Sequence, residues 1–401
     1  MTTKTTPTGK ATKRATGNKP AKKLRIGILF GGRSGEHEVS LNSASSILQA
    51  IDQAKYEIVP IGITRQGQWV TSDSAQRLLQ GQSSAPPPLP KRVSSQSVEL
   101  SASADLAQQH GALTHSLDVI FPVLHGTFGE DGTIQGLFEL ADIAYIGSGV
   151  LGSATGMDKS AMKQLFAAAG LPQTPHVNLL RSEWKADPKR CTRLIEKKLA
   201  YPVFVKPANL GSSVGISKVH SRAELAAAMD LAAGFDRKLI IEQGVGGPGV
   251  KPRELEVAVL GNDAPIASVV GEIIPNKEFY DYDSKYADAP ENPSIPIIPA
   301  ALSKSDARQI REMAIAAFRA CDCAGLARVD FLMEPARKGH RKSKPAIYLN
   351  EINTMPGFTS ISMYPKLWQA SGIPYKELID RLIALALERH AEKKQTSFTR
   401  A

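Results

Sequence analysis

The sequence predicts a protein of the α/β and α+β classes, with a parallel sheet near its N-terminus and mixed or antiparallel sheets farther along. Between residues 24 and 147, short apolar strands alternate with helical patterns, as in parallel β-α-β units. Beyond residue 254, alternating strands follow one another directly, which is typical of antiparallel pairing. The chain has 401 residues, 42% of them hydrophobic, which suits two or three domains with buried cores.

The first β-α-β unit follows a basic N-terminal segment. Residues 24–30 (LRIGILF) form an apolar run that ends at Gly31-Gly32, the pattern of a buried strand entering a loop. Helical spacing of apolar residues follows at 40–51, and residues 56–63 (YEIVPIGI) predict a second strand. Residues 81–97 are rich in Pro and Ser and predict a surface segment. The same region also predicts a strand at 117–126, a helix from about Thr133 and a strand at 143–147.

A helix at residues 159–170 (KSAMKQLFAAAG) opens the second region. Gly170 and Pro172 are residue types that commonly end a helix. Residues 147–158, just before it, are rich in Gly and Ser, so we expect a domain boundary there. The later elements are strands at 201–207, 215–220, 239–243, 254–261, 264–275, 326–333 and 346–353, with helices before 239, at 301–322 and from about Ser360 onward.

The formal net charge of +10 first suggests a nucleic-acid partner. However, residues 1–23 contain seven basic side chains and no acid, and residues 335–345 contain five more without an acid. The rest of the chain has a net charge of −2. Neither basic segment contains an aromatic residue for base stacking, so we expect no specific nucleic-acid partner.

Cysteine content and hydropathy indicate the compartment. The chain has three cysteines, Cys191, Cys321 and Cys323, in no spacing typical of secreted proteins, which favours a reducing, cytoplasmic location. No apolar run approaches the roughly 18 residues of a membrane helix, and the N-terminal segment lacks the apolar core of a secretory signal. We therefore expect no membrane partner.

Two glycine-rich loops follow strands of the predicted parallel sheet. In GGRSGEHEVS (31–40), Glu36 and Glu38 stand at a helix start, where an acid either stabilises the helix dipole or points into a cleft to bind an ammonium group. The G-x-G-x-x-G pattern of dinucleotide sites is absent. HGTFGEDGTIQG (125–136) also lies at the carboxyl end of a strand, where open α/β sheets bind ligands.

Phosphate chemistry is indicated by VFVKPANLGSSVGISKV (203–219). An apolar strand ends in Lys206, and small residues then form a loop that can fold over a phosphate. The order of a P-loop is absent, and a plain β-hairpin is the structural alternative. EFYDYDSKY (278–286) alternates aromatics with acids before Lys285 and Tyr286, which fits either a solvated strand edge or a loop that closes over a nucleotide.

Acidic and amide side chains stand at alternate positions of two apolar strands. Asp330 lies in LARVDFL (326–332), and Glu351 and Asn353 are two residues apart in the next strand, so all three can share one sheet face. Such an oxygen-only set suits Mg²⁺ that holds nucleotide phosphates. Arg328 faces the same side, and an internal salt bridge from Arg328 to Asp330 or Glu351 is the alternative.

Seven segments, taken in chain order, closely resemble the D-alanine:D-alanine ligase family of the ATP-grasp superfamily: GGRSGEHEVSLNS, HGTFGEDGTIQG, MDKSAMK, VKPANLGSSVGISKV, FYDYDSKY, ARVDFL and NEINTMPGFTSISMYP. The resemblance extends from about Leu24 to about Ala386. It implies an ATP-grasp fold with an N-terminal Rossmann-like parallel-sheet domain. The implied parts are a disordered basic arm (1–23), an N-terminal α/β domain (24–155), a small central ATP-grasp domain (156–244), a C-terminal catalytic domain (245–392) and a tail (393–401).

The resemblance also implies the function: ATP-dependent ligation of two D-alanine molecules through a D-alanyl phosphate, supplying peptidoglycan precursors. The implied cofactors are ATP and two Mg²⁺ or Mn²⁺ ions, and the implied assembly is a homodimer formed through the first domain. The implied ATP ligands are Lys159, Lys206, Ser213 and Lys285 for the phosphates, Glu242 for the adenine amino group, and Glu254, with Glu256 as the alternative, for the ribose. The implied metal ligands are Asp330, Glu351 and Asn353.

The remaining roles implied by the resemblance concern the amino acids. Glu36, linked to Ser212 and Tyr286, resembles the residue that binds the first D-alanine's ammonium group, with His125 nearby. Arg328 and the backbone at Gly357 would stabilise the oxyanion, and Ser362 and Met363 would hold the second D-alanine. Three features depart from the family pattern: the arm, the basic insertion at 335–345 and the long glycine-rich segment 244–255. The alternatives are an ATP-grasp ligase for other substrates, a nucleic-acid-binding protein and a dinucleotide oxidoreductase.

Overall fold

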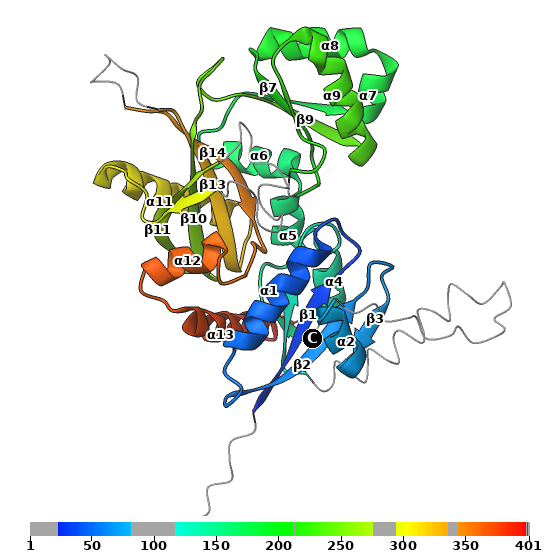
Figure 1. Cartoon of the computed structure of the whole chain (residues 1–401), viewed down its shortest axis with the longest axis vertical. Coiled ribbons are helices and arrows are strands. Elements are labelled where there is room, and N and C mark those ends of the chain that lie inside the picture. The colour runs from blue at the N-terminus through cyan, green and yellow to red at the C-terminus, as the bar shows by residue number, and fades with distance from the viewer. Residues whose placement is uncertain are drawn as a thin grey trace, which may run out of the picture.

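A computed structural model describes residues 23–81, 117–211, 213–275, 294–335, 344–397 and 399. These residues form three sheets with helices packed on them (Figure 1). The predicted N-terminal arm, nearly all of the Pro- and Ser-rich segment and most of the basic insertion lie outside the described residues.

The first sheet confirms the predicted parallel sheet. Its strand order is β3-β2-β1-β4-β5, and every pair is parallel except β2 with β3. Helix α1, which includes Glu38, begins three residues before the predicted helix, and β3 and α2 have no sequence prediction. The bounds are β1 Leu24–Gly31, α1 His37–Ala50, β2 Tyr56–Ile63, β3 Trp69–Thr71, α2 Ser72–Leu79, β4 Val119–Val123, α4 Thr133–Leu140 and β5 Ala144–Tyr145.

The second sheet is antiparallel, with the strand order β6-β9-β7-β8. Figure 1 shows its helices α7, α8 and α9 grouped at one end of the molecule. Their apolar faces bury a core with the sheet that includes Trp184, Ile195 and Met229. The bounds are β6 His176–Leu180, α7 Arg181–Ala186, α8 Pro188–Lys198, β7 Val203–Pro207, β8 Ser217–Val219, α9 Arg222–Phe235 and β9 Lys238–Gln243.

The third sheet, with the order β12-β11-β10-β13-β14, confirms the predicted antiparallel strands. Successive residues of β10 enter different cores: Val257 and Val259 join one, Ala258 and Leu260 the other. The bounds are β10 Arg253–Gly261, β11 Ile266–Ile274, β12 Ile295–Ile297, α11 Lys304–Ala320, β13 Gly325–Met333, β14 Ile347–Asn353, α12 Met363–Ala370 and α13 Tyr375–Lys393.

Apolar and polar contacts join the first and third sheets. Helices α12 and α13 contribute to a core shared with the first sheet, in which the rings of Phe121 and Phe358 lie 5.5 Å apart. On α13, Arg389 stacks over Tyr145 at 4.3 Å and donates to the carbonyl of Gly147. Because one core spans both sheets, the loops at their edges hold fixed positions relative to each other.

The Gly- and Ser-rich segment before residue 159 contains a helix, α5 (Val150–Met157), which leads into α6 (Lys159–Ala168). Its small residues serve close packing. A Cβ atom at Gly152 would lie 2.3 Å from the carbonyl oxygen of Asp322. The Gly- and Ser-rich composition from which we expected a domain boundary therefore also reflects helix packing. Within the described residues, no helix is both long enough and apolar enough to cross a membrane.

Candidate active site

A cavity of about 1090 Å³ lies where the three sheets meet. Its walls come from the start of α1, the loop after β4, the start of α6 and the strands β7, β9, β10, β13 and β14. Every predicted site residue that the structure describes lines this cavity: Glu36, His125, Lys159, Lys206, Ser213, Glu242, Glu254, Arg328, Asp330, Glu351, Asn353, Gly357, Ser362 and Met363. Three predicted residues, Ser212, Lys285 and Tyr286, lie outside the described residues.

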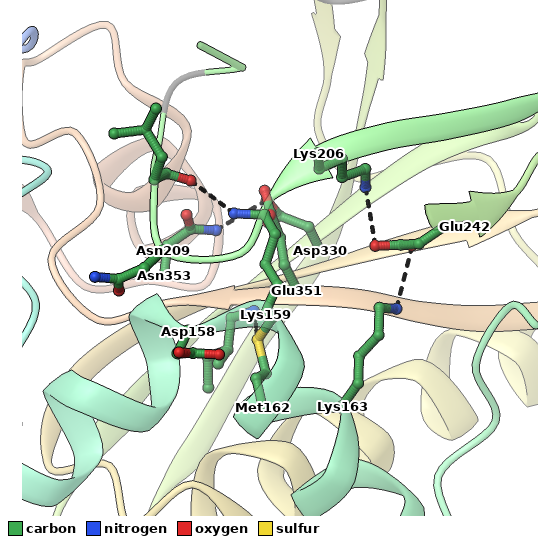
Figure 2. A network of polar contacts seen from close by, with 12 residues as sticks. Asp158, Lys159, Met162, Lys163, Lys206, Asn209, Glu242, Asp330, Glu351 and Asn353 are labelled. Carbon is green, nitrogen blue, oxygen red and sulfur yellow. Dashed lines mark hydrogen bonds and ion pairs between the residues drawn. The ribbon is translucent and has the colours of Figure 1, made fainter. Parts of the chain in front are cut away.

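Glu242, on β9, marks one end of the cavity and is paired with two lysines. Its Oε1 lies 3.2 Å from Nζ of Lys206 on β7, and its Oε2 lies 3.2 Å from Nζ of Lys163 on α6 (Figure 2). Burial raises the pKa of Glu242, but the two ammonium groups outweigh it and hold the pKa at about 2. The carboxylate is therefore ionised and can accept a hydrogen bond from a ligand.

Lys163 has no predicted role from the sequence. It lies one turn after Lys159 on α6, and its side chain is 0% exposed. The sequence contained one indication of a role: Lys163 lies on the buried face of an amphipathic helix, where a charge needs a partner. The partner, Glu242, is far away in the chain and cannot be identified from local sequence.

Lys159 stands at the first turn of α6, which Asp158 caps by accepting from the backbone N–H of Ser160 and Ala161, both at 3.0 Å. The Nζ of Lys159 donates to the carbonyl of Leu210 at 2.8 Å and lies 3.5 Å from Oε2 of Glu351. The cap thus positions a buried ammonium group between the small-residue loop after β7 and the carboxylates of the third sheet.

Asp330 and Glu351 are cross-strand neighbours on β13 and β14. Arg328 donates from Nε and Nη2 to the two oxygens of Asp330, each at 2.7 Å, and Nδ2 of Asn353 donates to the same carboxylate at 3.0 Å. The Nε of Arg328 also lies 3.3 Å from Oε2 of Glu256. The Arg328–Asp330 salt bridge considered from the sequence is therefore present, and Asn353 donates a hydrogen bond to the same carboxylate.

The oxygen atoms of Asp330, Glu351 and Asn353 suit a hard cation such as Mg²⁺. Two carboxylates and one amide, from adjacent strand ends that line one cavity, provide ligands of the right kind. Among the described residues, no group of three or more His, Cys, Asp or Glu side chains is arranged to hold a metal ion, so Asn353 is needed to complete the oxygen set.

Glu36 and Glu38 differ in environment, which resolves the two readings of the first loop. Glu38 also reaches the edge of the cavity, but it is exposed and forms an ion pair with Arg65. Glu36 is only 8% exposed, lines the cavity and lies between two glycine-rich loops. Gly126 has φ +78°, and a Cβ atom there would lie 2.4 Å from Oε2 of Glu36, so this loop requires glycine.

His125 and Glu130 come from the second glycine-rich loop. The carbonyl of Met355 lies 2.9 Å from Nδ1 of His125, and the hydroxyl of Ser43 lies 3.0 Å from its Nε2. Burial lowers the pKa of His125, so the ring is neutral, with Nδ1 donating to the carbonyl and Nε2 accepting from Ser43.

Glu130 has no predicted role from the sequence, although it lies in the quoted motif. Its carboxyl group accepts from the backbone N–H of Gly126 at 2.7 Å and of Met355 at 3.0 Å. Burial, together with the nearby charge of Glu36, raises its pKa to about 8. At neutral pH Glu130 is therefore mostly protonated, and a cationic group bound beside Glu36 would favour its ionised form.

Ser362 lies on the opposite wall of the cavity, at the N-terminus of α12. Its Oγ accepts from the backbone N–H of Thr359 at 3.1 Å and lies 2.7 Å from Oγ1 of Thr359. A Cβ atom at Gly357 would lie 3.2 Å from this hydroxyl. A hydroxyl at a helix N-terminus is suited to bind a carboxylate.

Comparisons with known proteins identify the relatives of this chain. Family models described as "D-ala D-ala ligase N-terminus" and "D-ala D-ala ligase C-terminus" match residues 25–148 and 165–384. A D-alanine–D-alanine ligase of Heliobacterium modesticaldum is 50% identical over 381 residues, covering 94% of this chain and 98% of the relative. One of Geobacillus thermodenitrificans is 49% identical, covering 94% and 99%.

Solved structures agree with these relatives. The D-alanine-D-alanine ligase from Coxiella burnetii matches with a TM-score of 0.72 and 35% identity, covering 94% of this chain and 97% of that one. The VanG D-Ala:D-Ser ligase from Enterococcus faecalis matches with a TM-score of 0.72 and 34% identity, covering 91% and 100%.

Proposed function

Because this chain belongs to the D-alanine–D-alanine ligase family, we propose that its cavity binds ATP at the Glu242 end and two D-alanine molecules between Glu36 and Ser362. The enzyme has the ATP-grasp fold and uses ATP to join two D-alanine molecules for peptidoglycan synthesis. The assignment of ATP to one end of the cavity and of D-alanine to the other rests on the separation of positive and negative side chains along it. Lysines lie near Glu242, and the buried acid Glu36 lies at the start of α1.

The nucleotide is held by residues of the second and third sheets. Glu242 accepts from the amino group of adenine, and Glu254, at the cavity end of β10, takes the ribose hydroxyls. Lys159 and Lys206 neutralise the phosphates, with Ser213 and Lys285 from the loops that cover them. We assign the ribose to Glu254 rather than to Glu256, whose Oε2 lies 3.3 Å from Nε of Arg328.

Asp330, Glu351 and Asn353 would hold two Mg²⁺ or Mn²⁺ ions at this end of the cavity. Such ions supply charge stabilisation to the transferring phosphoryl group. In the structure described here Arg328 occupies both oxygens of Asp330, so Arg328 must give up at least one of these hydrogen bonds when Asp330 takes a ligand role. The ammonium group of Lys159 would in turn be shared between Glu351 and the phosphates.

The first D-alanine enters with its ammonium group on Glu36, assisted by Ser212 and Tyr286, and with His125 beside it. A carboxylate does not react with an amine, so one of its oxygens first attacks the γ-phosphorus of ATP and releases ADP. This step forms D-alanyl phosphate. Water would hydrolyse that intermediate, so the loop around Gly211 has to exclude water while it persists.

The second D-alanine is held by its carboxylate at Ser362 and Met363. Its neutral amine attacks the carbonyl carbon of D-alanyl phosphate, a C–N bond forms, a proton leaves the nitrogen and phosphate departs. The tetrahedral oxyanion of this step is stabilised by the guanidinium of Arg328 and the backbone N–H of Gly357. These groups contribute most in a cavity that excludes water.

The nature of the second substrate is a direct prediction of this assignment. The FYDYDSKY loop containing Tyr286 resembles that of dipeptide-forming relatives, so the main product from a mixture of D-alanine, D-serine and D-lactate at neutral pH is D-alanyl-D-alanine. Mass spectrometry of the products tests this. A product consisting mainly of the D-lactate ester or the D-serine dipeptide would contradict the assignment of the second-substrate site.

Three further features belong to the same proposal. The domains are 24–155, 156–244 and 245–392, and these ranges contain the first, second and third sheets respectively. The enzyme acts in the cytoplasm as a homodimer that pairs through its first domain. The arm at 1–23 and the insertion at 335–345 have no part in the reaction.

A further inference from the structure

Lys163 is a fully buried lysine that the reaction described above does not use. Its side chain is 0% exposed, and it does not line the cavity. An isolated buried ammonium group costs several kcal/mol in folding free energy, so its retention in the interior calls for a function or a partner. Among the residues that the structure describes, its ionic partner is Glu242, whose Oε2 lies 3.2 Å from Nζ of Lys163.

Glu242 receives a different lysine on each of its oxygens. Figure 2 shows Lys206 and Lys163 approaching the carboxylate from opposite sides, from β7 and α6 respectively. The hydroxyl of Thr174 adds a hydrogen bond of 3.3 Å to Oε2, the oxygen on the Lys163 side. The two oxygens are therefore not equivalent: Oε2 is held by Lys163 and Thr174, and Oε1 is held by Lys206, which lines the cavity.

The two lysines also differ in what they can reach. Lys206 lines the cavity, where it is assigned to the phosphates of ATP. When Lys206 moves to a phosphate, Oε1 of Glu242 loses its partner and becomes available to a ligand. Lys163 cannot follow, because its ammonium group is enclosed between α6 and β9. Lys163 remains beside Oε2 of Glu242 whether or not Lys206 has moved to a phosphate.

We propose that Lys163 is a positioning residue of the nucleotide site, which fixes the carboxylate of Glu242 so that its free oxygen selects a base carrying an exocyclic amino group. This inference rests on the proposed binding of ATP at this end of the cavity. A fixed, ionised carboxylate accepts a hydrogen bond from the 6-amino group of adenine. It repels the 6-oxo group that hypoxanthine and guanine carry at the same place, since both atoms are acceptors.

The charges around Glu242 support this role. Burial raises the pKa of Glu242 and lowers that of Lys163, so each group on its own would tend to become neutral. Their mutual attraction opposes both effects, and the pKa of Glu242 stays at about 2. After Lys206 has moved away, Lys163 is the charge that continues to keep this carboxylate ionised.

The test is the selectivity of Lys163→Met for ATP over inosine triphosphate, in which an oxygen replaces the 6-amino group of the base and N1 carries a proton. We expect the KM for ATP to rise about tenfold and the ratio of kcat/KM values for the two nucleotides to fall about tenfold, because a charge-assisted hydrogen bond is weakened. The value of kcat at saturating ATP should change far less, since no reacting atom is touched. Unchanged selectivity in a folded Lys163→Met protein would overturn the inference.

Two comparisons separate positioning from a general structural effect. Lys197→Met, an exposed lysine on α8 in the same part of the chain, should leave both nucleotides unaffected. In a Glu242→Gln background, Lys163→Met should leave the ATP to inosine triphosphate ratio unchanged, because the residue through which it acts is already altered. A further fall of this ratio in the Glu242→Gln background would overturn the inference, even if the Lys163→Met single variant does not fold.

Failure of the underlying proposal looks different. If the wild-type enzyme shows no preference between ATP and inosine triphosphate, or if Glu242→Gln leaves the preference intact, then Glu242 does not read the base. If the wild-type enzyme is selective through Glu242 but Lys163→Met is equally selective, only the role of Lys163 is lost.

Discussion

Replacing Arg328 by alanine is expected to lower kcat by about 100- to 1,000-fold, the effect typical of removing one oxyanion-stabilising donor. Arg328 lies on β13 inside the cavity, with its guanidinium held by Asp330 and Glu256 at 2.7 and 3.3 Å. Those two contacts aim it at the space between the substrate positions. Steady-state turnover measures the loss, and nucleotide titration checks that ATP still binds.

Arg328→Lys is the matched control. It keeps the positive charge between Asp330 and Glu256 but loses the bidentate geometry, so its kcat should lie between those of the wild type and Arg328→Ala. Near-normal D-alanine-dependent phosphate release by Arg328→Ala would show that Arg328 does not stabilise the oxyanion. If Arg328→Ala loses ATP binding as well as turnover, Arg328 belongs to the nucleotide site instead.

Glu36→Gln is expected to raise the KM for the first D-alanine by about 10- to 100-fold, because a buried charged hydrogen-bond acceptor for the ammonium group is lost. The carboxylate is 8% exposed and lies against the loops of Gly126 and Gly211. The KM for ATP should change little, since the nucleotide lies at the other end of the cavity. Initial rates over a range of D-alanine concentrations give both constants.

Glu38→Gln is a close control for this variant, two residues away on the same helix. Glu38 is exposed and paired with Arg65, so its loss should leave both KM values unchanged. Equal effects of the two substitutions would contradict a specific role for Glu36. A change in the KM for ATP alone would mean that the two ends of the cavity are assigned in the wrong order.

The parallel and antiparallel sheets could be predicted because their strands are apolar runs bounded by Gly and Pro. The regions of β6, α7 and α8 could not, because HVNLL (176–180) is short and half-exposed, and its place in the sheet depends on pairing with β9, which lies some sixty residues later. Helix α5 was hidden by the Gly and Ser residues that let it pack closely against the third sheet.

In the site, sequence motifs identified residues whose chemistry is unusual for their setting, such as Asp330 in an apolar strand. They did not reveal which residues pair. Glu242 and Lys163 are far apart in sequence, and neither Lys163 nor Glu130 could be assigned before the fold placed each beside another charge. The net positive charge of the chain first suggested a nucleic-acid partner. The lysines that matter for the proposed site are the few that are buried near Glu242 and Glu351.

The most direct test of the central claim is phosphate release from ATP by the purified enzyme with D-alanine, with L-alanine and with no amino acid. D-alanine alone should stimulate release strongly, with one phosphate formed for each D-alanyl-D-alanine, because only the D enantiomer places its carboxylate at the γ-phosphate while its ammonium group contacts Glu36. Equal release under all three conditions would contradict the assignment of this chain as a D-alanine-dependent ligase.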